Sequence, residues 1–213
     1  MLKTIGIFGG TFDPVHKGHI TLALELKNHL QLDEMRLIPC RLPPHRPLPS
    51  ASDQDRLHML RLATANTPLL IDDREIKRDG PSYTIDTLHS LRSEMGKDAS
   101  LVLCMGMDAF AGLTTWHRWE EIPALAHIAV VSRADYHEAF DPQIKQLLAQ
   151  HQTQTREDLC KLPHGKIYLT QLSQIPVSST RVRQALATSR FERLSDLDPH
   201  VNAFIQQQGL YRQ

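Results

Sequence analysis

Two histidines near the N-terminus, His16 and His19, lie three residues apart in the stretch GIFGGTFDPVHKGH, residues 6–19. The same stretch carries Gly9 and Gly10 directly after a short apolar run. Glycines let backbone N–H groups come close to an anion because no Cβ intervenes. An imidazole can donate to a phosphate oxygen whether it is neutral or charged. The combination favours a phosphate site at the end of the first strand.

Three other interpretations of the two histidines stay open. His16 and His19 could ligate a metal, for which Asp13 is the nearby third ligand. They could instead be helix caps or surface groups, or one of them could be a lone general base. The stretch does not match the G-x-x-x-x-G-K-[ST] phosphate loop, since Lys17 does not lie where that loop has its lysine.

A second polar segment, SSTRVR at residues 178–183, lies near the other end of the chain. Ser178, Ser179 and Thr180 are typical of the start of a helix, where free N–H groups and hydroxyl donors gather. Arg183 follows one turn later, and its guanidinium can donate to two phosphate oxygens at once. Alone, the segment could be a simple cap followed by a surface arginine. Together with the first stretch it favours a phosphate site in two parts.

The elements that must position these residues alternate along the chain. Apolar runs predict strands at 4–8, 35–38, 69–71, 101–105, 127–132 and 166–170. Apolar periodicity and caps predict helices at 18–30, 54–65, 83–95, 142–151, 179–187 and 199–208. A proline-rich loop at 39–51, a charged loop at 72–82 and a turn at 106–108 complete the pattern.

Such alternation predicts an α/β fold, a Rossmann-like, doubly wound and mostly parallel sheet with helices on both faces. We expect one domain over 1–213, with an insertion at about 135–165. Ligands of such sheets bind at the carboxyl ends of the strands, where the strand order reverses, and the first strand usually lies beside that point.

Composition narrows the classes of function. The chain has 213 residues, and its 24 Lys and Arg balance its 24 Asp and Glu, which argues against a general nucleic-acid binder. No apolar run approaches the length that spans a bilayer, and no signal peptide follows Met1. Three widely spaced cysteines are typical of reduced thiols. We expect a cytoplasmic protein, a monomer or small homo-oligomer, without membrane or nucleic-acid partners.

The two polar segments carry a family resemblance. GGTFDPVHKGH, with His16-Lys17-Gly18-His19 as its H-x-G-H element, and SSTRVR resemble the two signatures of the nucleotidyltransferase superfamily. Within it, the chain resembles the bacterial nicotinate mononucleotide adenylyltransferases over essentially its whole length. The segments that carry this resemblance are PPHRP (43–47), REIKRDGPSYTIDTL (74–88), GMDAF (106–110), TTWHRWEEI (114–122) and QGLYR (208–212).

The resemblance implies roles on the ATP side. His16, His19 and Arg183 would hold the ATP phosphates and form the catalytic set. Backbone groups of the first turn would line the nucleotide pocket, Asp108 would accept hydrogen bonds from the ribose hydroxyls, and Ser179 and Thr180 would donate to the phosphates as well. The further ATP-binding residues are thus Gly9, Gly10, Thr11, Phe12, Asp108, Ser179 and Thr180.

It also implies roles on the mononucleotide side. Trp116 would stack on the pyridine ring, while Thr84, Ile85 and His117 would frame the nicotinate carboxylate, the last two through backbone N–H groups. His117 stands where family members often carry tyrosine, which a backbone contact tolerates. His45, Arg46 and Arg133 are candidates for the substrate phosphate.

The reaction so implied joins ATP and nicotinate mononucleotide into deamido-NAD and pyrophosphate, by in-line attack without a covalent intermediate. Mg²⁺ would enter with ATP, and no metal would be held by the protein alone. Two alternatives remain. One is transfer to another acceptor, such as nicotinamide mononucleotide or a phosphopantetheine-like compound. The other is a nucleotide-sensing protein that has lost turnover.

Overall fold

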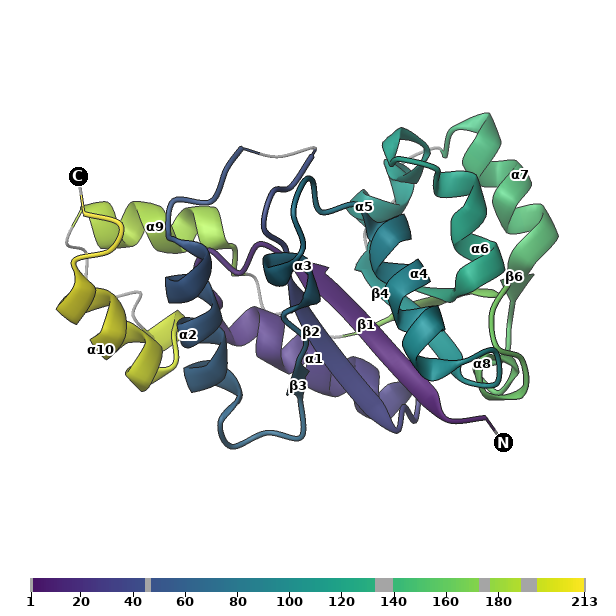
Figure 1. Cartoon of the computed structure of the whole chain (residues 1–213), viewed down its shortest axis with the longest axis horizontal. Coiled ribbons are helices and arrows are strands. Elements are labelled where there is room, and N and C mark those ends of the chain that lie inside the picture. The colour runs from purple at the N-terminus through teal and green to yellow at the C-terminus, as the bar shows by residue number, and fades with distance from the viewer. Residues whose placement is uncertain (1, 45–46, 133–139, 173–176, 189–194, 213) are drawn as a thin grey trace.

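The computed structural model describes residues 2–44, 47–132, 140–172, 177–188 and 195–212 (Figure 1). Within these residues seven strands form one sheet in the order β3-β2-β1-β4-β5-β7-β6, and every neighbouring pair is parallel. The strands are β1 Thr4–Gly10, β2 Glu34–Pro39, β3 Leu70–Ile71, β4 Ser100–Gly106, β5 His127–Ser132, β6 Gln152–Thr153 and β7 Ile167–Gln171. The predicted α/β fold is confirmed.

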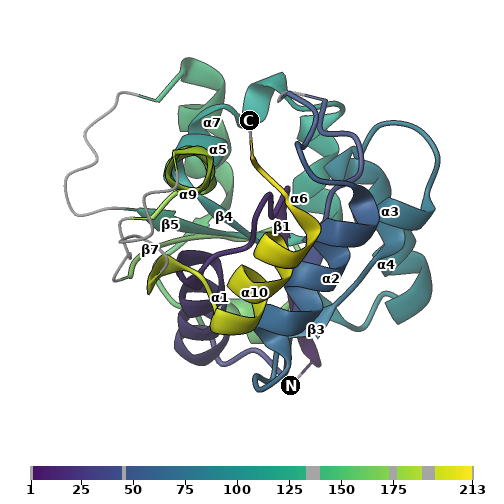
Figure 2. The same ribbon diagram turned by 90° about the vertical axis from the view of Figure 1, so that its left-hand side faces the viewer.

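Helices cover both faces of this sheet. The longer ones are α1 Lys17–His29, α2 Asp53–Thr64, α4 Thr84–Met95, α7 Pro142–His151, α9 Ser179–Ala187 and α10 Pro199–Gln208. All six were predicted, with bounds that differ by one residue at most. Figure 1 shows α2, α9 and α10 gathered at one end of the molecule and α4 to α7 at the other, while Figure 2 shows α2 and α10 side by side.

The core divides into two clusters because successive strand residues face opposite sides of the sheet. In β4, Val102 and Cys104 pack with residues of α1, α2, α9 and α10, while Leu101 and Leu103 pack with residues of α4, α5, α6 and α7. Buried on both faces, the central strands read as continuous apolar runs. This explains why runs without alternation were sufficient to find them.

Short elements depart from the sequence prediction. The charged segment at 72–82 is not all loop, since it contains the helix α3 Arg74–Lys77, and the segment after β4 continues as the helix α5 Met107–Ala111 rather than a simple turn. β6, α6 Ile122–Leu125, α8 Asp158–Lys161 and the 3-10 turns η1 Leu113–Thr115 and η2 Trp119–Glu121 were not predicted. Each is five residues or fewer, too short to show a hydrophobic period. The insertion at about 135–165 stays a prediction.

The strand order reverses between β1 and β4. The chain runs outward from β1 through β2 to β3, then returns so that β4 pairs with the other side of β1. The carboxyl ends of these two strands therefore lie side by side at the crevice where such sheets bind ligands. None of the helices in the described segments is long and apolar enough to cross a membrane.

A buried histidine, His127, begins β5 and so lies at the amino-terminal ends of the strands, on the side of the sheet away from the crevice. Its Nδ1 accepts from the N–H of Lys166 at 2.9 Å, and its Nε2 lies 2.8 Å from the carbonyl of Leu162. The ring is therefore neutral, with its proton on Nε2. Burial lowers the pKa of His127 to about 4, because protonation would charge a buried ring and remove the acceptor for Lys166.

We expect His127 to make the protein less stable as the pH falls. The unfolded chain takes up this proton near the ordinary histidine pKa and the folded chain only near 4, so stability is lost between these two values. Between pH 7 and pH 5 the loss from this residue is about 2 kcal/mol. Urea unfolding of His127→Gln at both pH values should show a smaller loss than the wild type, with His89→Gln, at an exposed site on α4, as the control. An equal pH dependence in wild type and His127→Gln would contradict the assignment.

Candidate active site

The carboxyl ends of β1 and β4 expose backbone rather than side chains. A Cβ placed on Gly9, or on Gly106 at the end of β4, would meet no atom within 4 Å. These two glycines therefore leave open space above the two central strands, and a ligand can approach their backbone. Gly10 differs, because a Cβ there would lie 3.2 Å from the ring of Phe12. Gly10 makes room for a side chain of the protein itself.

The turn after β1 is held in an uncommon conformation. Phe12 has a φ of 47°, in the left-handed region that phenylalanine rarely adopts. Its ring is fully buried, with its centroid 6.2 Å from that of Phe8 and 5.1 Å from that of His19, both in edge arrangements. Packing compensates the backbone strain. The turn thereby directs the chain from β1 into the start of α1.

His16 and His19 lie together at the start of α1. Their rings stack with centroids 3.7 Å apart, and the Nδ1 of His19 accepts from the N–H of His16 at 3.3 Å. In its neutral form His19 therefore carries its proton on Nε2, which makes that nitrogen a donor. His16 is only 6% exposed, and burial lowers its pKa to about 4. At neutral pH His16 is uncharged.

The second polar segment lies against this turn. Ser178 caps α9 by accepting from the N–H of Arg181, as the sequence predicts. The hydroxyl of Ser179 donates to the carbonyl of Pro14 at 3.0 Å, and Nη1 of Arg183 donates to the carbonyl of Asp13 at 2.5 Å. The structure thus brings together His16, His19, Ser179, Thr180 and Arg183, from opposite ends of the chain. Ser179 uses its hydroxyl proton within the protein, so toward a ligand it offers a lone pair or its backbone N–H.

The carboxylate of Asp13 joins several segments around the site. Its two oxygens accept from the N–H groups of Ser50 and Ala51 at 2.7 and 3.1 Å and from the hydroxyl of Tyr211 at 2.7 Å. Nη1 of Arg183 lies 3.8 Å from the same carboxylate. Burial and the adjacent carboxylate raise the pKa of Tyr211, so its hydroxyl stays protonated and donates.

These contacts remove the basis for a metal at the two histidines. Asp13 was the nearby third ligand, and its oxygens already accept from three donors of the protein. Within the described segments, no three His, Cys, Asp or Glu side chains gather where they could hold a metal ion.

The other nucleotide-side and acceptor-side residues follow neighbouring elements. Asp108 is exposed in the first turn of α5, directly after β4. Thr84 and Ile85 are the first two residues of α4, where backbone N–H groups have no partner within the helix and the dipole is positive. Ser82, just before them, accepts from the N–H groups of Arg41 and Leu42. The start of the proline-rich loop is thereby attached to the start of α4.

Trp116 and His117 follow η1. Trp116 is half-buried and packs against the core cluster that contains Ile85 and Phe110. His117 is exposed, and its ring centroid lies 4.4 Å from that of Tyr83, the residue before α4. This contact joins the segment around Trp116 to the start of α4. His45, Arg46 and Arg133 lie outside the described residues.

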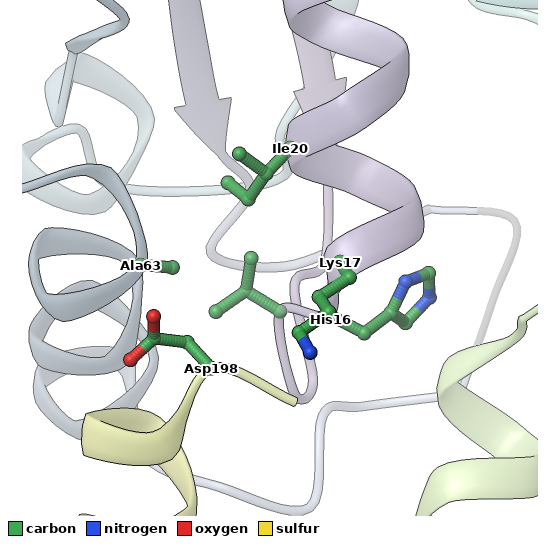
Figure 3. Close-up of a pocket in the computed structure, with 6 residues that line it drawn as sticks. His16, Lys17, Ile20, Ala63 and Asp198 are labelled. Carbon is green, nitrogen blue, oxygen red and sulfur yellow. The ribbon is translucent and has the colours of Figure 1, made fainter. Parts of the chain in front are cut away.

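A small cavity of about 70 Å³ lies behind the start of α1 (Figure 3). Its lining comprises Val15, His16, Lys17, Ile20, Ala63 and Asp198. Figure 3 shows the imidazole of His16 pointing away from the middle of this cavity. The volume suffices for one or two water molecules and not for a nucleotide. The cavity is a packing gap between α1, α2 and the start of α10, and it is distinct from the crevice at the ends of β1 and β4.

Sequence reasoning missed the structural role of three residues that shape the site, although Asp13 had been named as a possible metal ligand and Tyr211 lies in the QGLYR segment. Arg56 is fully buried beneath the turn, and Tyr211 and Asp13 form the contact described above. Arg56 could have been noticed, because it lies on the inner face of α2, four residues before Leu60. No pattern in the sequence connects Tyr211 with Asp13, since they are 198 positions apart.

We expect Tyr211→Phe to destabilise the protein by about 2 kcal/mol, because it removes a donor to a buried carboxylate. Urea unfolding at pH 7 measures the loss. Tyr168→Phe is the matched control, since Tyr168 packs against the same core cluster and its hydroxyl has no hydrogen-bond partner among the described residues. If Tyr211→Phe were as stable as the wild type, the hydrogen bond would not hold the C-terminal segment.

Comparison with known proteins supports the family resemblance. Residues 7–185 match the model of the family described as cytidylyltransferase-like. Relatives named "probable nicotinate-nucleotide adenylyltransferase" occur in Aeromonas hydrophila, 47% identical with 100% of this chain and 99% of the relative covered, and in Cellvibrio japonicus, 47% identical with both covered fully.

A solved structure of similar fold is that of the Plasmodium falciparum nicotinic acid mononucleotide adenylyltransferase complexed with NaAD. It has a TM-score of 0.75 at 18% identity, with 98% of this chain and 97% of that chain covered. At this identity the match supports the fold alone, whereas the full-length relatives support the family. The chain therefore belongs to the nicotinate-nucleotide adenylyltransferase family, within the cytidylyltransferase-like nucleotidyltransferases.

Proposed function

We propose that this protein transfers the adenylyl group of ATP to nicotinate mononucleotide, giving deamido-NAD and pyrophosphate. The observation that carries the proposal is the direct contact between the two polar segments, through Ser179 with Pro14 and Arg183 with Asp13. It places two helix N-termini and one arginine beside the exposed backbone of the switch point, an arrangement suited to a polyphosphate. The names of the full-length relatives support the choice of substrates.

The chemistry requires alignment rather than a base. An oxygen of the mononucleotide phosphate attacks the α-phosphorus of ATP, the bond from that phosphorus to the bridging oxygen breaks, and pyrophosphate leaves with the electron pair. The attacking phosphate is already deprotonated at neutral pH, so no proton must be removed. The protein must hold two anions in line and stabilise charge on the α-phosphate and the leaving group.

The three catalytic residues differ in what they supply. Arg183 supplies a permanent positive charge, and its guanidinium is oriented by the carbonyl of Asp13. His19 supplies the Nε2–H donor that its contact with His16 specifies. His16 is buried and neutral, so it contributes a hydrogen-bonding group and a stacking partner for His19 rather than a charge. This keeps part of the site free of further positive charge before ATP binds.

The remaining nucleotide contacts come from adjacent strand ends. Backbone groups of Gly9 to Phe12 would line the pocket, and the backbone amides at Ser179 and Thr180 would face the phosphates. Asp108 would accept hydrogen bonds from the two ribose hydroxyls, for which an exposed carboxylate after β4 is well suited.

The acceptor side uses the start of α4. The N–H groups of Thr84 and Ile85 would bind the nicotinate carboxylate, since a helix N-terminus favours a negative charge. Trp116 would stack on the pyridine ring, and the backbone N–H of His117 would add a third donor. The neutral amide of nicotinamide mononucleotide would interact less favourably with this dipole. The site would therefore bind nicotinate mononucleotide more tightly than nicotinamide mononucleotide.

We expect Mg²⁺ to enter with ATP and to be held by phosphate oxygens and water. Asp13, the carboxylate nearest in sequence to the two histidines, already accepts three hydrogen bonds from the protein, so phosphate oxygens and water would supply most of the ligands. When bound, the ion would neutralise part of the charge on the polyphosphate. We expect the enzyme to work in the cytoplasm as a monomer or small homo-oligomer.

Pyrophosphate release from ATP is the decisive measurement. The purified protein should release pyrophosphate with nicotinate mononucleotide and more slowly with nicotinamide mononucleotide at equal concentration. Faster release with the amide, or with a phosphopantetheine acceptor, would change the assigned substrate. No release with any acceptor, although ATP binds, would favour a sensing protein.

We expect His19→Ala to lower kcat by about 100-fold with a much smaller change in the KM for ATP, because the phosphates gain charge at the point of transfer. Steady-state kinetics separate the two parameters. His29→Ala, at the far end of the same helix, should keep the wild-type kcat. A near-normal kcat for His19→Ala would exclude His19 from the catalytic set.

We expect Trp116→Ala to raise the KM for nicotinate mononucleotide by about tenfold, because stacking on a flat ring contributes on the order of 1–3 kcal/mol. The KM for ATP should change little. Trp119→Ala is the control, since Trp119 is also half-buried and packs against the same core cluster. Equal effects of the two substitutions would indicate a packing role for Trp116.

A further inference from the structure

Arg56 is a fully buried arginine beneath the turn that follows β1. Its Nη1 donates to the carbonyl of Thr11 at 2.6 Å, and its Nη2 donates to the carbonyl of Cys40 and to Asp53, both at 2.7 Å. Thr11 belongs to the turn, Cys40 follows β2, and Asp53 begins α2. One guanidinium therefore connects the segments that leave two neighbouring strands.

This contact fixes the direction of two peptide groups in the turn. The carbonyl of Gly10 accepts from the N–H of Cys40 at 3.0 Å, and the carbonyl of Thr11 accepts from Arg56. Both peptides are trans, since the cis bond in this stretch is Asp13-Pro14. In a trans peptide the N–H points opposite to the carbonyl. Both carbonyl oxygens therefore face β2 and α2, and the N–H groups of Thr11 and Phe12 are directed to the other side.

We propose that Arg56 is a positioning residue that keeps the carbonyl of Thr11 turned away from the bound polyphosphate. A carbonyl oxygen facing an anion would repel it, whereas the positive end of the peptide dipole attracts it. The inference rests on the proposed function, in which the turn binds the phosphates of ATP. Arg56 acts through the turn and touches no substrate.

Stability alone gives a poor account of this arginine. Burying a charge costs free energy that a single ion pair rarely repays, and the partner Asp53 is 35% exposed at its side chain. The Nε of Arg56 is buried without a hydrogen-bond partner among the described residues. An apolar side chain of similar volume would pack there without this cost. An apolar residue at position 56 would, however, donate no hydrogen bond to the carbonyls of Thr11 and Cys40.

Arg56 also connects the turn with the proline-rich loop at 39–51. Its contact with the carbonyl of Cys40 fixes the start of that loop, and Asp53 lies 3.5 Å from Nε of Arg41 in the same loop. The other end of the loop is held by Asp13 through Ser50 and Ala51. Arg56 therefore holds the turn that we propose binds ATP. It also holds the beginning of the loop that carries His45 and Arg46, our candidates for binding the phosphate of nicotinate mononucleotide.

The test compares Arg56→Lys with Arg92→Lys. A lysine at 56 keeps the charge but cannot donate to Thr11, Cys40 and Asp53 in the planar geometry of a guanidinium. Arg92 is the matched control, because it donates to the carbonyls of Gly96, Ala99, Leu125 and Pro163 and its Nε is likewise buried without a partner among the described residues. Ala99 and Leu125 lie before β4 and β5, at the edge of the sheet opposite the site.

Calorimetry measures the affinity of each protein for ATP and for adenosine, and pyrophosphate release gives kcat. We expect Arg56→Lys to weaken ATP binding about tenfold and to lower kcat, while adenosine, which lacks phosphates, binds as in the wild type. Arg92→Lys should keep both affinities and kcat, although we expect urea unfolding to give it a lower free energy of unfolding than the wild type. Loss of adenosine binding together with ATP binding would indicate general damage at the site and overturn the proposal.

The two proposals fail in different ways. If the wild type transfers adenylyl groups and Arg56→Lys matches it in ATP affinity and kcat, the role of Arg56 is wrong and the function stands. If the wild type binds ATP but transfers nothing to nicotinate mononucleotide, the function is wrong, and the ratio of ATP to adenosine affinity in Arg56→Lys still decides the role of Arg56. Similar losses of ATP binding in both lysine variants would overturn the role of Arg56.

Discussion

The carboxylate of Asp13 is the interaction on which the arrangement of the site depends. It is buried, and it accepts from the end of the proline-rich loop and from Tyr211, while Arg183 lies beside it. A buried carboxylate needs several donors to offset its lost hydration, so these segments must converge on it. The first turn, the second polar segment and the C-terminal segment are thereby fixed relative to one another, although they are far apart in the sequence.

Charge in the proposed phosphate site is limited by the same packing. Arg183 is oriented toward Asp13, His16 is neutral because it is buried, and Arg56 lies beneath the turn. Among the described residues, the positive potential that we propose for a polyphosphate includes the guanidinium of Arg183, two helix N-termini and oriented peptide groups. In the proposed transfer, such groups would be held in place before the ligand arrives, so little reorganisation would be needed as charge develops.

The sequence was sufficient to predict the parallel sheet and the six longer helices, while the site at the carboxyl ends of the strands stays a prediction. Apolar runs identify buried strands, and Ser178 identifies a helix start, because these signals are local. Contacts between distant segments could not be predicted in this way. Nothing near Tyr211 specifies a partner at Asp13, and the hydrogen bond from the Ser179 hydroxyl to Pro14 depends on how the start of α9 meets the turn after β1. The predicted roles of individual residues toward substrates depend on family resemblance.

The hydrogen bond from Tyr211 to Asp13 has a consequence for biosynthesis. Strand β1 and its turn are synthesised before the segments that contact them, and the hydroxyl that completes the environment of Asp13 follows 198 residues later. Until then the carboxylate lacks one donor, and the segment around Arg183 is also missing for most of translation. The two polar segments can meet only after the second of them has been synthesised, about 165 residues after the first. A chain that ends prematurely therefore has its first signature and lacks a finished site.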